Sequence, residues 1–518
     1  MTPAFAPKTF LPKLFFTLIF TVTAGLGLLG LDYGRYGDEP RLLNAVSESV
    51  RTLLFLPRWY NYPSLSYTLV LLNATPQLFR IGQDAVHTKT FSPALLEELS
   101  KVPASDPSFL VRTRAIFFIV TWLGVVWVYL LLRTITGHEW TPALAAGTLA
   151  SSWELQYHAR LIAPDGLVFS FGALCLWLIA SFLKRGKRGW IIGATIAAAL
   201  ACGAKYQGGI FLLPVLIASL HSSTQPTLRR QRIKTILSLV GIFCLAFLLT
   251  TPGALADTFK FISSILFEFR HYQTGHGNFT VAPGLSHAWL LLQYLASVVF
   301  SPFVFLALIP FLLAIFGFSS FIKTRPRLEA SVFCLAPILF FTFMICQRAL
   351  NVRNNILLFS FLTLFFGLGL LHLSQRFFRE QRRWIPYTLV ALLLIPNVGY
   401  QVVALHAIRH PEQTYEQAIR TLETRKEIIY LSSEAAAYLG REPRLAPLLS
   451  QDPTRATGYV FLDTEVTGRF PANHPRTYTV LAGSLESNMD YYPTFIPLRT
   501  KVVRMDRALA ERLGIIPN

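Results

Sequence analysis

The sequence is poor in charged residues and in cysteine. Only 14% of its 518 residues are charged, whereas soluble domains average about 25%. The five cysteines form no Cys-x-x-Cys pair and have no histidine at ligand spacing, which argues against a zinc site or a disulfide framework. Hydrophobic residues, in contrast, make up 53% of the chain. This composition indicates a polytopic membrane protein.

Acidic residues are scarcer than basic ones, 28 against 47, which gives a formal net charge of +19. Such a charge can indicate a nucleic-acid partner, but its distribution argues against one. The tail from His406 to Asn518 is nearly neutral, with 14 basic and 13 acidic residues. The excess therefore lies before residue 406, in short clusters between apolar runs, which is the pattern of membrane topology.

The long apolar runs predict an all-α membrane protein with about eleven transmembrane helices, since each crossing needs about 20 apolar residues. The expected spans are 10–31, 109–132, 141–159, 162–183, 190–204, 207–220, 235–252, 288–318, 329–347, 354–373 and 384–405. With the N-terminus inside, the basic clusters all fall in cytoplasmic loops. These clusters lie at 184–188, 229–234, 323–327 and 376–383. Because no small-residue cleavage site follows the first run, we expect a retained span and not a signal peptide.

The stretch 190–220 is too long for one spanning helix, since its 31 residues would measure about 46 Å against a membrane core of about 30 Å. Both flanking basic clusters must lie inside, which requires an even number of crossings. Gly203, Gly208 and Gly209 supply a break. We therefore expect two short helices, with Lys205 between them at the outer face.

The first outer loop, 32–108, is unusually long. Within it, residues 41–54 place leucines and valines on one helical face and polar side chains on the other. This pattern predicts an amphipathic helix lying in the membrane interface. The loop belongs to a membrane domain that we expect to cover residues 1–405.

The tail has a different pattern and predicts a small extracytoplasmic α/β domain over 406–518. Short strands are expected at 428–431, 459–462 and 478–481, and a helix at 412–424. The tail contains no recognisable catalytic motif.

Charged residues collect on the predicted outer face, where an ionisable side chain is a functional hypothesis by default. They are Asp38, Glu39, Arg160, Asp165, Lys205, Arg270, His271, His276, Arg348 and Arg353. Structural interpretations remain open: Asp38 or Asp165 can cap the following helix, and a lysine or arginine can extend to the interface. Together, however, cations at headgroup depth suit a phosphate, and a nearby carboxylate suits general-base activation of a hydroxyl. The pattern predicts a substrate that is part lipid and part phosphate.

Four segments on this face carry a family resemblance. They are Tyr36-Gly-Asp-Glu-Pro40, Tyr62-Pro-Ser-Leu-Ser-Tyr67, Arg160-Leu-Ile-Ala-Pro-Asp165 and Gly203-Ala-Lys-Tyr-Gln-Gly208. Their order and residue patterns resemble those of the GT-C superfamily of lipid-carrier-dependent glycosyltransferases, in the branch of protein O-mannosyltransferases and lipid A aminoarabinose transferases. Two positions depart from the family: Ser64 replaces a second proline, and 351–355 lacks the Arg-Tyr…Pro pattern of the late outer loop.

The resemblance implies an enzyme of the cytoplasmic (inner) membrane that moves one sugar from a polyprenyl phosphate, such as undecaprenyl phosphate, to an acceptor hydroxyl or phosphate. Transfer would take place on the extracytoplasmic side with inversion at the anomeric carbon. The implied partners are the lipid-linked donor, membrane lipids and an envelope glycan, lipid or protein acceptor, and no nucleic acid.

The same resemblance assigns roles to the candidate residues. Asp38 would be the general base, Glu39 would position the acceptor or a metal, and Asp165 would orient Arg160 or the sugar. The residues expected to bind the donor phosphate are Lys205, Arg160, Arg353, Arg348 and Arg270. Those expected to position acceptor or donor are Tyr62, Tyr67, His271, His276 and Tyr206. No cofactor is assigned, and a divalent metal at Asp38 and Glu39 is left open.

Two other classes compete with this interpretation. A transporter or flippase of a lipid-linked anion would use Asp38 and Asp165 as proton relays, but such proteins usually have paired halves with broken helices near the bilayer midplane. A membrane scaffold that presents the tail would leave Asp38 unexplained. The depth of a bound lipid phosphate separates enzyme from transporter, since the enzyme would hold it at outer headgroup depth.

Overall fold

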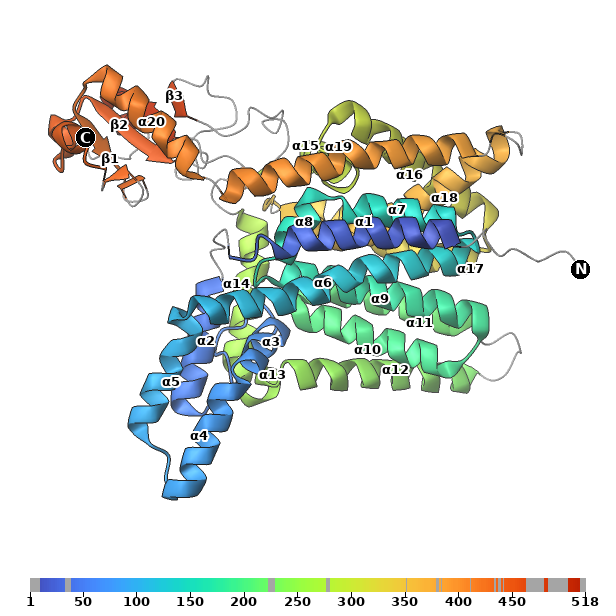
Figure 1. The fold of residues 1–518 in the computed structure, drawn as a ribbon. Helices are drawn as coiled ribbons and strands as arrows, with labels where there is room; N and C mark the ends of the chain where they lie inside the picture. Colours follow the sequence, from blue (N-terminus) through green and yellow to red (C-terminus); the bar gives the residue numbers. More distant parts are fainter. Residues whose placement is uncertain are drawn as a thin grey trace, which may run out of the picture.

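Most of the chain is a bundle of long apolar helices that run roughly along one axis (Figure 1). The computed structural model describes residues 10–32, 39–221, 229–275, 280–350, 352–378, 382, 384–409, 411–432, 435–436, 439–440, 442–462, 479–482 and 502–512. Asp38 and His276 lie outside the described residues, so their predicted roles have no structural counterpart here.

Within the described residues, eight helices are long and apolar enough to cross a membrane. They are α1 (Phe10–Leu28), α6 (Pro107–Thr136), α9 (Pro164–Arg185), α12 (Arg229–Thr250), α16 (Val304–Thr324), α17 (Arg327–Ile345), α18 (Phe359–Phe377) and α19 (Trp384–Arg409). Three shorter apolar helices accompany them: α10 (Arg188–Ala204), α11 (Leu212–His221), which follows the 3-10 turn η1 (Tyr206–Phe211), and α15 (Leu285–Val299). The predicted fold class, a polytopic α-helical membrane protein with a small α/β unit, is confirmed.

Local sequence explains where these helices begin and end, as α6 illustrates. The Asp106 carboxylate accepts a hydrogen bond from the backbone N–H of Ser108 at 2.8 Å, and Pro107 occupies the first turn. Both features favour a helix start. The helix ends at Gly137, which has a left-handed φ of 63°, a conformation that glycine adopts without steric cost.

Two expected spans are each broken into two helices. The span 141–159 becomes α7 (Trp140–Ala150) and α8 (Trp153–Ala159), because the hydroxyl of Ser152 accepts a hydrogen bond from the N–H of Leu155 at 3.2 Å and starts a new helix. The span 288–318 becomes α15 and α16, separated by a segment that contains Pro302. Proline cannot donate a helical hydrogen bond, so the prediction of one continuous helix was wrong there. The break expected in 190–220 is confirmed, since α10 ends at Ala204.

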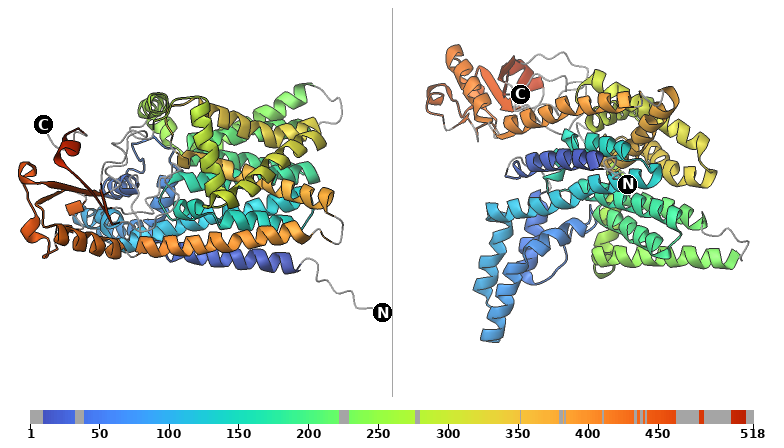
Figure 2. Two further views of the ribbon diagram at one scale, coloured as in Figure 1. Left: turned by 90° about the horizontal axis from the view of Figure 1, so that it is seen from above. Right: turned by 45° about the vertical axis from the view of Figure 1, so that its right-hand side comes forward.

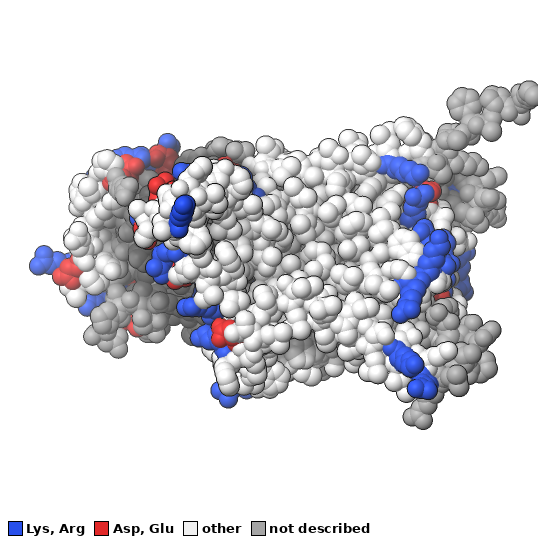
Figure 3. All heavy atoms as spheres, turned by 90° about the horizontal axis from the view of Figure 1, so that it is seen from below, with Lys and Arg blue, Asp and Glu red and all other residues white. Residues whose placement is uncertain are grey.

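Basic side chains gather at one end of the bundle. Figure 3 shows a broad uncharged belt, bounded on one side by a band that is almost entirely basic and on the other by side chains of both signs. The basic clusters occur where α9 meets α10, at the start of α12, between α16 and α17, and after α18. A single sign of charge at one end of an apolar belt is the asymmetry that the positive-inside rule describes.

An arm of four helices projects from the opposite end (Figures 1 and 2). It consists of α2 (Glu39–Thr52), α3 (Leu65–Asn73), α4 (Thr75–Thr88) and α5 (Pro93–Ser105). The amphipathic pattern of α2 is confirmed, but its apolar face, which includes Val46 and Val50, is buried against α3 and α5. Packing within the arm therefore covers this face, and the position of the helix in the membrane interface stays a prediction.

The tail has its own small core at the same end as the arm (Figure 1). Helix α20 (Pro411–Arg425) precedes a sheet with the strand order β1-β2-β4-β3. The strands are β1 (Ile429–Leu431), β2 (Gly458–Leu462), β3 (Thr479–Ala482) and β4 (Val502–Met505), and α23 (Arg507–Arg512) follows. The β1–β2 pair is parallel, with Tyr430 opposite Tyr459, and the other pairs are antiparallel. The expected helix and strands are present, and β4 was not predicted.

Candidate active site at the end of the bundle near the arm

A buried ion pair between Asp165 and Lys205 forms the centre of the site. The Lys205 ammonium lies 2.6 Å from Oδ1 of Asp165, and the two side chains are only 1% and 6% exposed. Lys205 also donates a hydrogen bond to the side-chain oxygen of Asn354. The sequence also allowed a structural interpretation, in which the Lys205 side chain merely extends to the membrane interface. That interpretation is excluded, because the ammonium is enclosed and paired.

The sequence places both charges at helix ends. Asp165 lies in the first turn of α9, directly after Pro164, where a negative charge is favoured by the helix dipole. Lys205 follows the last residue of α10 in an extended conformation, with φ −152° and ψ 135°. A side chain at Gly208 could not fit, since its Cβ would lie 2.3 Å from the carbonyl oxygen of Ala201. This close approach of η1 to α10 fixes the turn that presents Lys205.

A second cation and an aromatic ring complete one side of the site. Arg353 lies in the 3-10 turn η2 (Val352–Leu358) and is buried, and its Nε lies 3.9 Å from Oδ2 of Asp165. Its Nη2 donates to the Tyr62 hydroxyl at 3.4 Å. The Lys205 ammonium lies 5.6 Å from the centre of the Tyr62 ring, within the range of a cation–π contact. Tyr62, from the first outer loop, therefore contacts both cations.

Three residues at the site were not predicted from the sequence. Asn354 donates from its amide to the Tyr272 hydroxyl at 2.6 Å, and Gln207 donates to the same hydroxyl at 3.1 Å. Tyr272 belongs to α14 (Thr258–Thr274), and its backbone oxygen accepts from the N–H of Arg348 at 3.1 Å. Two of the three lie inside segments already singled out, Gln207 in the lysine motif and Asn354 in 351–355. Their polar amide side chains were the features of the sequence that could have identified them as site residues.

A second buried ion pair anchors the residue that follows Asp38. Both Glu39 oxygens accept from the Arg114 guanidinium, with Nε to Oε1 at 2.9 Å, and Oε1 also accepts from the backbone N–H of Ile162 at 2.9 Å. Arg114 in turn donates to the carbonyl of Leu31 at 2.9 Å. These bonds join the start of α2, the first turns of α6 and the Arg160–Asp165 segment. Sequence reasoning missed Arg114, although an arginine inside the start of an apolar span is a signal of this kind.

Arg160 is buried but lies apart from the Asp165–Lys205 pair. Its guanidinium packs over the Tyr157 ring at 5.4 Å and against Gly30, where a Cβ would lie 2.1 Å from Nη1. Burial lowers the pKa of Arg160 to about 10. Within the described residues, its Nε and Nη1 have no hydrogen-bond partner, which is a costly arrangement for a buried donor. Asp165, which was predicted to orient Arg160, instead pairs with Lys205.

The remaining predicted residues differ in their burial and in the contacts that they make. Arg270 and Arg348 are exposed, and His271 is half-buried and stacks on Phe267. Tyr206 donates from its hydroxyl to the carbonyl of Tyr60 at 2.7 Å. Tyr67 is buried, with its hydroxyl 2.6 Å from that of Ser49. The last two contacts hold the first outer loop and the arm in place.

A further buried polar cluster lies between α8 and α15. Glu154 is fully buried, its Oε1 lies 3.1 Å from Nε2 of His158, and it accepts from the Tyr294 hydroxyl at 2.9 Å. Its Oε2 has no hydrogen-bond partner among the described residues. Glu154 and His158 are four residues apart on one helix, which was a signal in the sequence, whereas Tyr294 is 140 positions away from Glu154.

The described residues contain no group of three or more histidine, cysteine, aspartate or glutamate side chains that could hold a metal. Glu39 is fully engaged by Arg114 and Ile162, and Asp38 is not described. A metal at this pair stays an untested prediction.

Comparison with known proteins finds a family segment that contains part of this site. Residues 109–251 match the model of the dolichyl-phosphate-mannose-protein mannosyltransferase family. The segment runs from the start of α6 to the end of α12 and includes both Asp165 and Lys205. This match confirms the predicted resemblance and the predicted class, a membrane glycosyltransferase. No curated protein matches the chain in sequence.

Similar structures have been solved. ArnT from Cupriavidus metallidurans bound to undecaprenyl phosphate aligns over 95% of this chain and 97% of its own, with 12% identity and a TM-score of 0.48. The oligosaccharyltransferase AglB from Archaeoglobus fulgidus, in complex with an inhibitory peptide and a dolichol phosphate, aligns over 89% of this chain and 71% of its own, with 12% identity and a TM-score of 0.44.

Proposed function

We propose that this protein transfers a single sugar from a polyprenyl-phosphate donor to an acceptor hydroxyl or phosphate on the extracytoplasmic side of the inner membrane, with inversion. The observation that carries the proposal is the buried cluster of Lys205, Arg353, Asp165 and Asn354 inside and beside the family segment. Two cations near a single carboxylate leave the site with a positive charge, which suits a phosphate ligand.

The depth of the cluster favours an enzyme over a transporter. Asp165 lies in the first turn of α9, Lys205 follows the last turn of α10, and Arg353 lies in the turn before α18. All three are therefore at helix ends, near the arm, where the headgroup of a lipid-linked donor would lie (Figure 1). A transporter for a lipid-linked anion would instead hold its ligand near the bilayer midplane.

In the proposed mechanism, each charged residue has one task. Lys205 and Arg353 stabilise the negative charge that develops on the departing lipid phosphate, an effect often worth several kcal/mol at the transition state. Asp165 holds the Lys205 ammonium in place, and Tyr62 covers both cations. Asp38 takes the proton of the acceptor hydroxyl as the bond to the anomeric carbon forms on the face opposite the phosphate.

In this proposal Glu39 does not contact the acceptor but helps to position Asp38, the residue before it. Both of its oxygens are occupied by Arg114 and Ile162, so the loop that carries Asp38 joins α2 at a fixed point. Arg160, Arg270 and Arg348 are proposed as further contacts of the donor phosphate. His271 and His276 are proposed to position the acceptor or the donor. Tyr206 and Tyr67 would do so indirectly, because their hydroxyls hold the segment between α2 and α3 and the arm in place.

The proposed function is tested with the purified protein, a panel of polyprenyl-phosphate sugars and membrane extract as the source of acceptor. We expect one sugar mass to be added to an envelope component, detected by mass spectrometry, and free polyprenyl phosphate to be released in equal amount. Movement of the intact donor between the leaflets of proteoliposomes, without release of the lipid phosphate, would contradict the proposal and identify a transporter.

The proposed orientation gives a prediction of its own. In a Cys346→Ser background, which removes an exposed cysteine, a cysteine at Arg455 in the tail should react with a membrane-impermeant thiol reagent in intact cells. A cysteine at Lys323, at the basic end, should react only after the cells are opened, because the basic end faces the cytoplasm. The reverse pattern would place the proposed site in the cytoplasm, away from the acceptor.

A further inference from the structure

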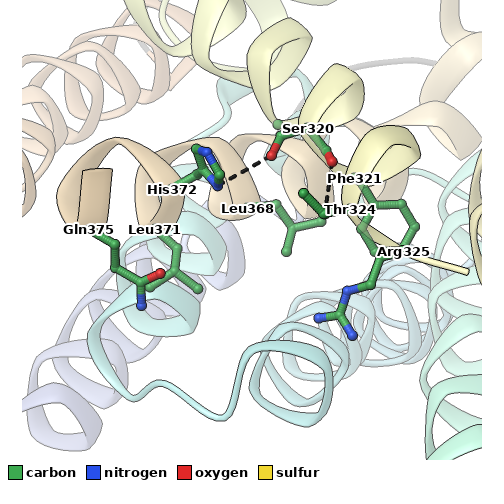
Figure 4. A pocket seen from close by; sticks show the side chains of 9 residues that line it. Ser320, Phe321, Thr324, Arg325, Leu368, Leu371, His372 and Gln375 are labelled. Carbon is green, nitrogen blue, oxygen red and sulfur yellow. Dashed lines mark hydrogen bonds between the residues drawn. The ribbon is translucent and has the colours of Figure 1, made fainter. Parts of the chain in front are cut away.

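A pocket of about 160 Å³ lies at the basic end of the bundle, far along the helices from the proposed active site. It is formed by the last turns of α16 and α18, which end at Thr324 and Phe377. In Figure 4, Ser320 and His372 face each other from the two helices, with Gln375 on one side and Arg325 on the other. The proposed transfer reaction does not use this pocket.

The pocket is built by a close contact between two helix backbones. A Cβ at Gly317 would lie 2.0 Å from the carbonyl oxygen of Phe365, and one at Gly369 would lie 1.9 Å from that of Leu313. Only glycine allows such an approach, so α16 and α18 are held together at this level. Gly317 also lines the pocket, which therefore begins where the tight contact ends.

Polar groups from both helices converge on the pocket. The Ser320 hydroxyl lies 3.2 Å from Nδ1 of His372, and the Thr324 hydroxyl donates to the carbonyl of Ser320 at 2.8 Å. The amide of Gln375 and the guanidinium of Arg325 add further donors. None of the described residues that line the pocket is acidic.

Arg325 is fixed at the edge of the pocket. Its guanidinium donates to the carbonyl of Ile135 at 3.5 Å, packs over the Phe321 ring at 5.8 Å and lies 3.4 Å from the Glu329 carboxylate. Glu329 compensates part of its charge, but the same end of the bundle carries the basic clusters shown in Figure 3. The local field therefore attracts anions.

The surroundings of the pocket are those of a lipid site. Phe321, Leu368 and Leu371 form an apolar wall beside these donors. A ligand with a phosphate and acyl chains would place its headgroup among the donors and the start of its chains against this apolar wall. Basic pockets between transmembrane helices on the cytoplasmic side are a known setting for anionic headgroups.

We infer that this pocket binds the phosphodiester headgroup of an anionic phospholipid in the leaflet opposite the proposed active site. The inference rests on the Ser320–His372 pair, Arg325 and the apolar wall, and it holds whether or not the proposed transfer reaction is correct.

The test measures lipid binding to the full-length protein, purified in detergent and depleted of lipid. Phosphatidylglycerol, phosphatidylcholine and inorganic phosphate are titrated separately, with bound mass and melting temperature as readouts. We expect saturable binding of phosphatidylglycerol that raises the melting temperature, and much weaker binding of the other two. Equal binding of inorganic phosphate would overturn the lipid assignment, and equal binding of phosphatidylcholine would overturn the role of the headgroup charge.

Variants identify the pocket as the site. Arg325→Gln keeps a donor for Ile135 and should weaken phosphatidylglycerol binding by about tenfold, the effect of one lost charge-assisted hydrogen bond. Gln375→Leu, at an exposed position, should weaken it by about threefold. The matched control is Lys323→Gln, which removes the same charge from an exposed neighbour that does not line the pocket. Equal losses in the control and in Arg325→Gln would show diffuse attraction to the basic end and overturn the inference.

Discussion

Asp38→Asn is expected to reduce sugar transfer by about 10²–10⁴-fold, the usual contribution of a general base, while donor binding and folding stay normal. An amide cannot accept the proton of the acceptor, whereas the donor phosphate is assigned to Lys205 and Arg353. The measurement compares turnover with the affinity for the polyprenyl-phosphate donor, both on the purified variant.

A capping role for Asp38 predicts a different outcome, and Asp106 supplies the matched control. Asp106 caps α6 from the same end of the bundle, and asparagine caps a helix about as well as aspartate. Asp106→Asn should therefore leave turnover unchanged. If Asp38→Asn behaves like Asp106→Asn, the general base must be sought elsewhere, with Asp165 as the next candidate.

Glu39→Gln provides a second contrast for the same experiment. It removes the charge partner of Arg114, which is only 1% exposed, and a buried charge left without its partner typically costs about 3–5 kcal/mol. This variant should therefore lose thermal stability and yield, whereas Asp38→Asn should lose only turnover. The two adjacent carboxylates thus separate a structural role from a catalytic one.

Lys205→Met and Asp165→Leu are each expected to be inactive and unstable, and the double variant is expected to be inactive but more stable than Asp165→Leu, which leaves two buried cations without their carboxylate. Each single change leaves a buried charge that has lost its closest partner, at a cost of about 3–5 kcal/mol, whereas replacing both charges with apolar side chains is often neutral or stabilising. Turnover in the double variant should remain reduced by about 10²-fold or more, because the electrostatic stabilisation of the leaving phosphate is still absent.

The readouts are the melting temperature and donor turnover of the two single variants, the double variant and Lys260→Met. Lys260 is an exposed lysine on α14, so its loss should change neither quantity. Recovery of both stability and turnover in the double variant would show that the pair only supports the fold, and the phosphate site would then have to lie elsewhere.

Local patterns in the sequence determined the helices and the order of the candidate residues along the chain. Apolar runs separated by basic clusters are local signals, and they gave the bundle and the basic end that Figure 3 shows. The glycines near Lys205 gave the break after α10, because close backbone approach depends on the residue at that position. The strands β1 to β3 followed from short β-rich runs, whereas β4 has a mixed composition that no local pattern distinguishes.

Only the tertiary structure decided which charges meet. Asp165 and Lys205 are 40 positions apart in the chain, Glu39 and Arg114 are 75 apart, and Arg353 and Tyr62 are 291 apart. A helix end specifies the depth of a side chain, but not the neighbouring helix that it faces, because that depends on how the apolar faces of all helices pack together. The burial of charges follows from the same packing, which is why the sequence predicted the break that carries Lys205 but not its enclosure beside Asp165.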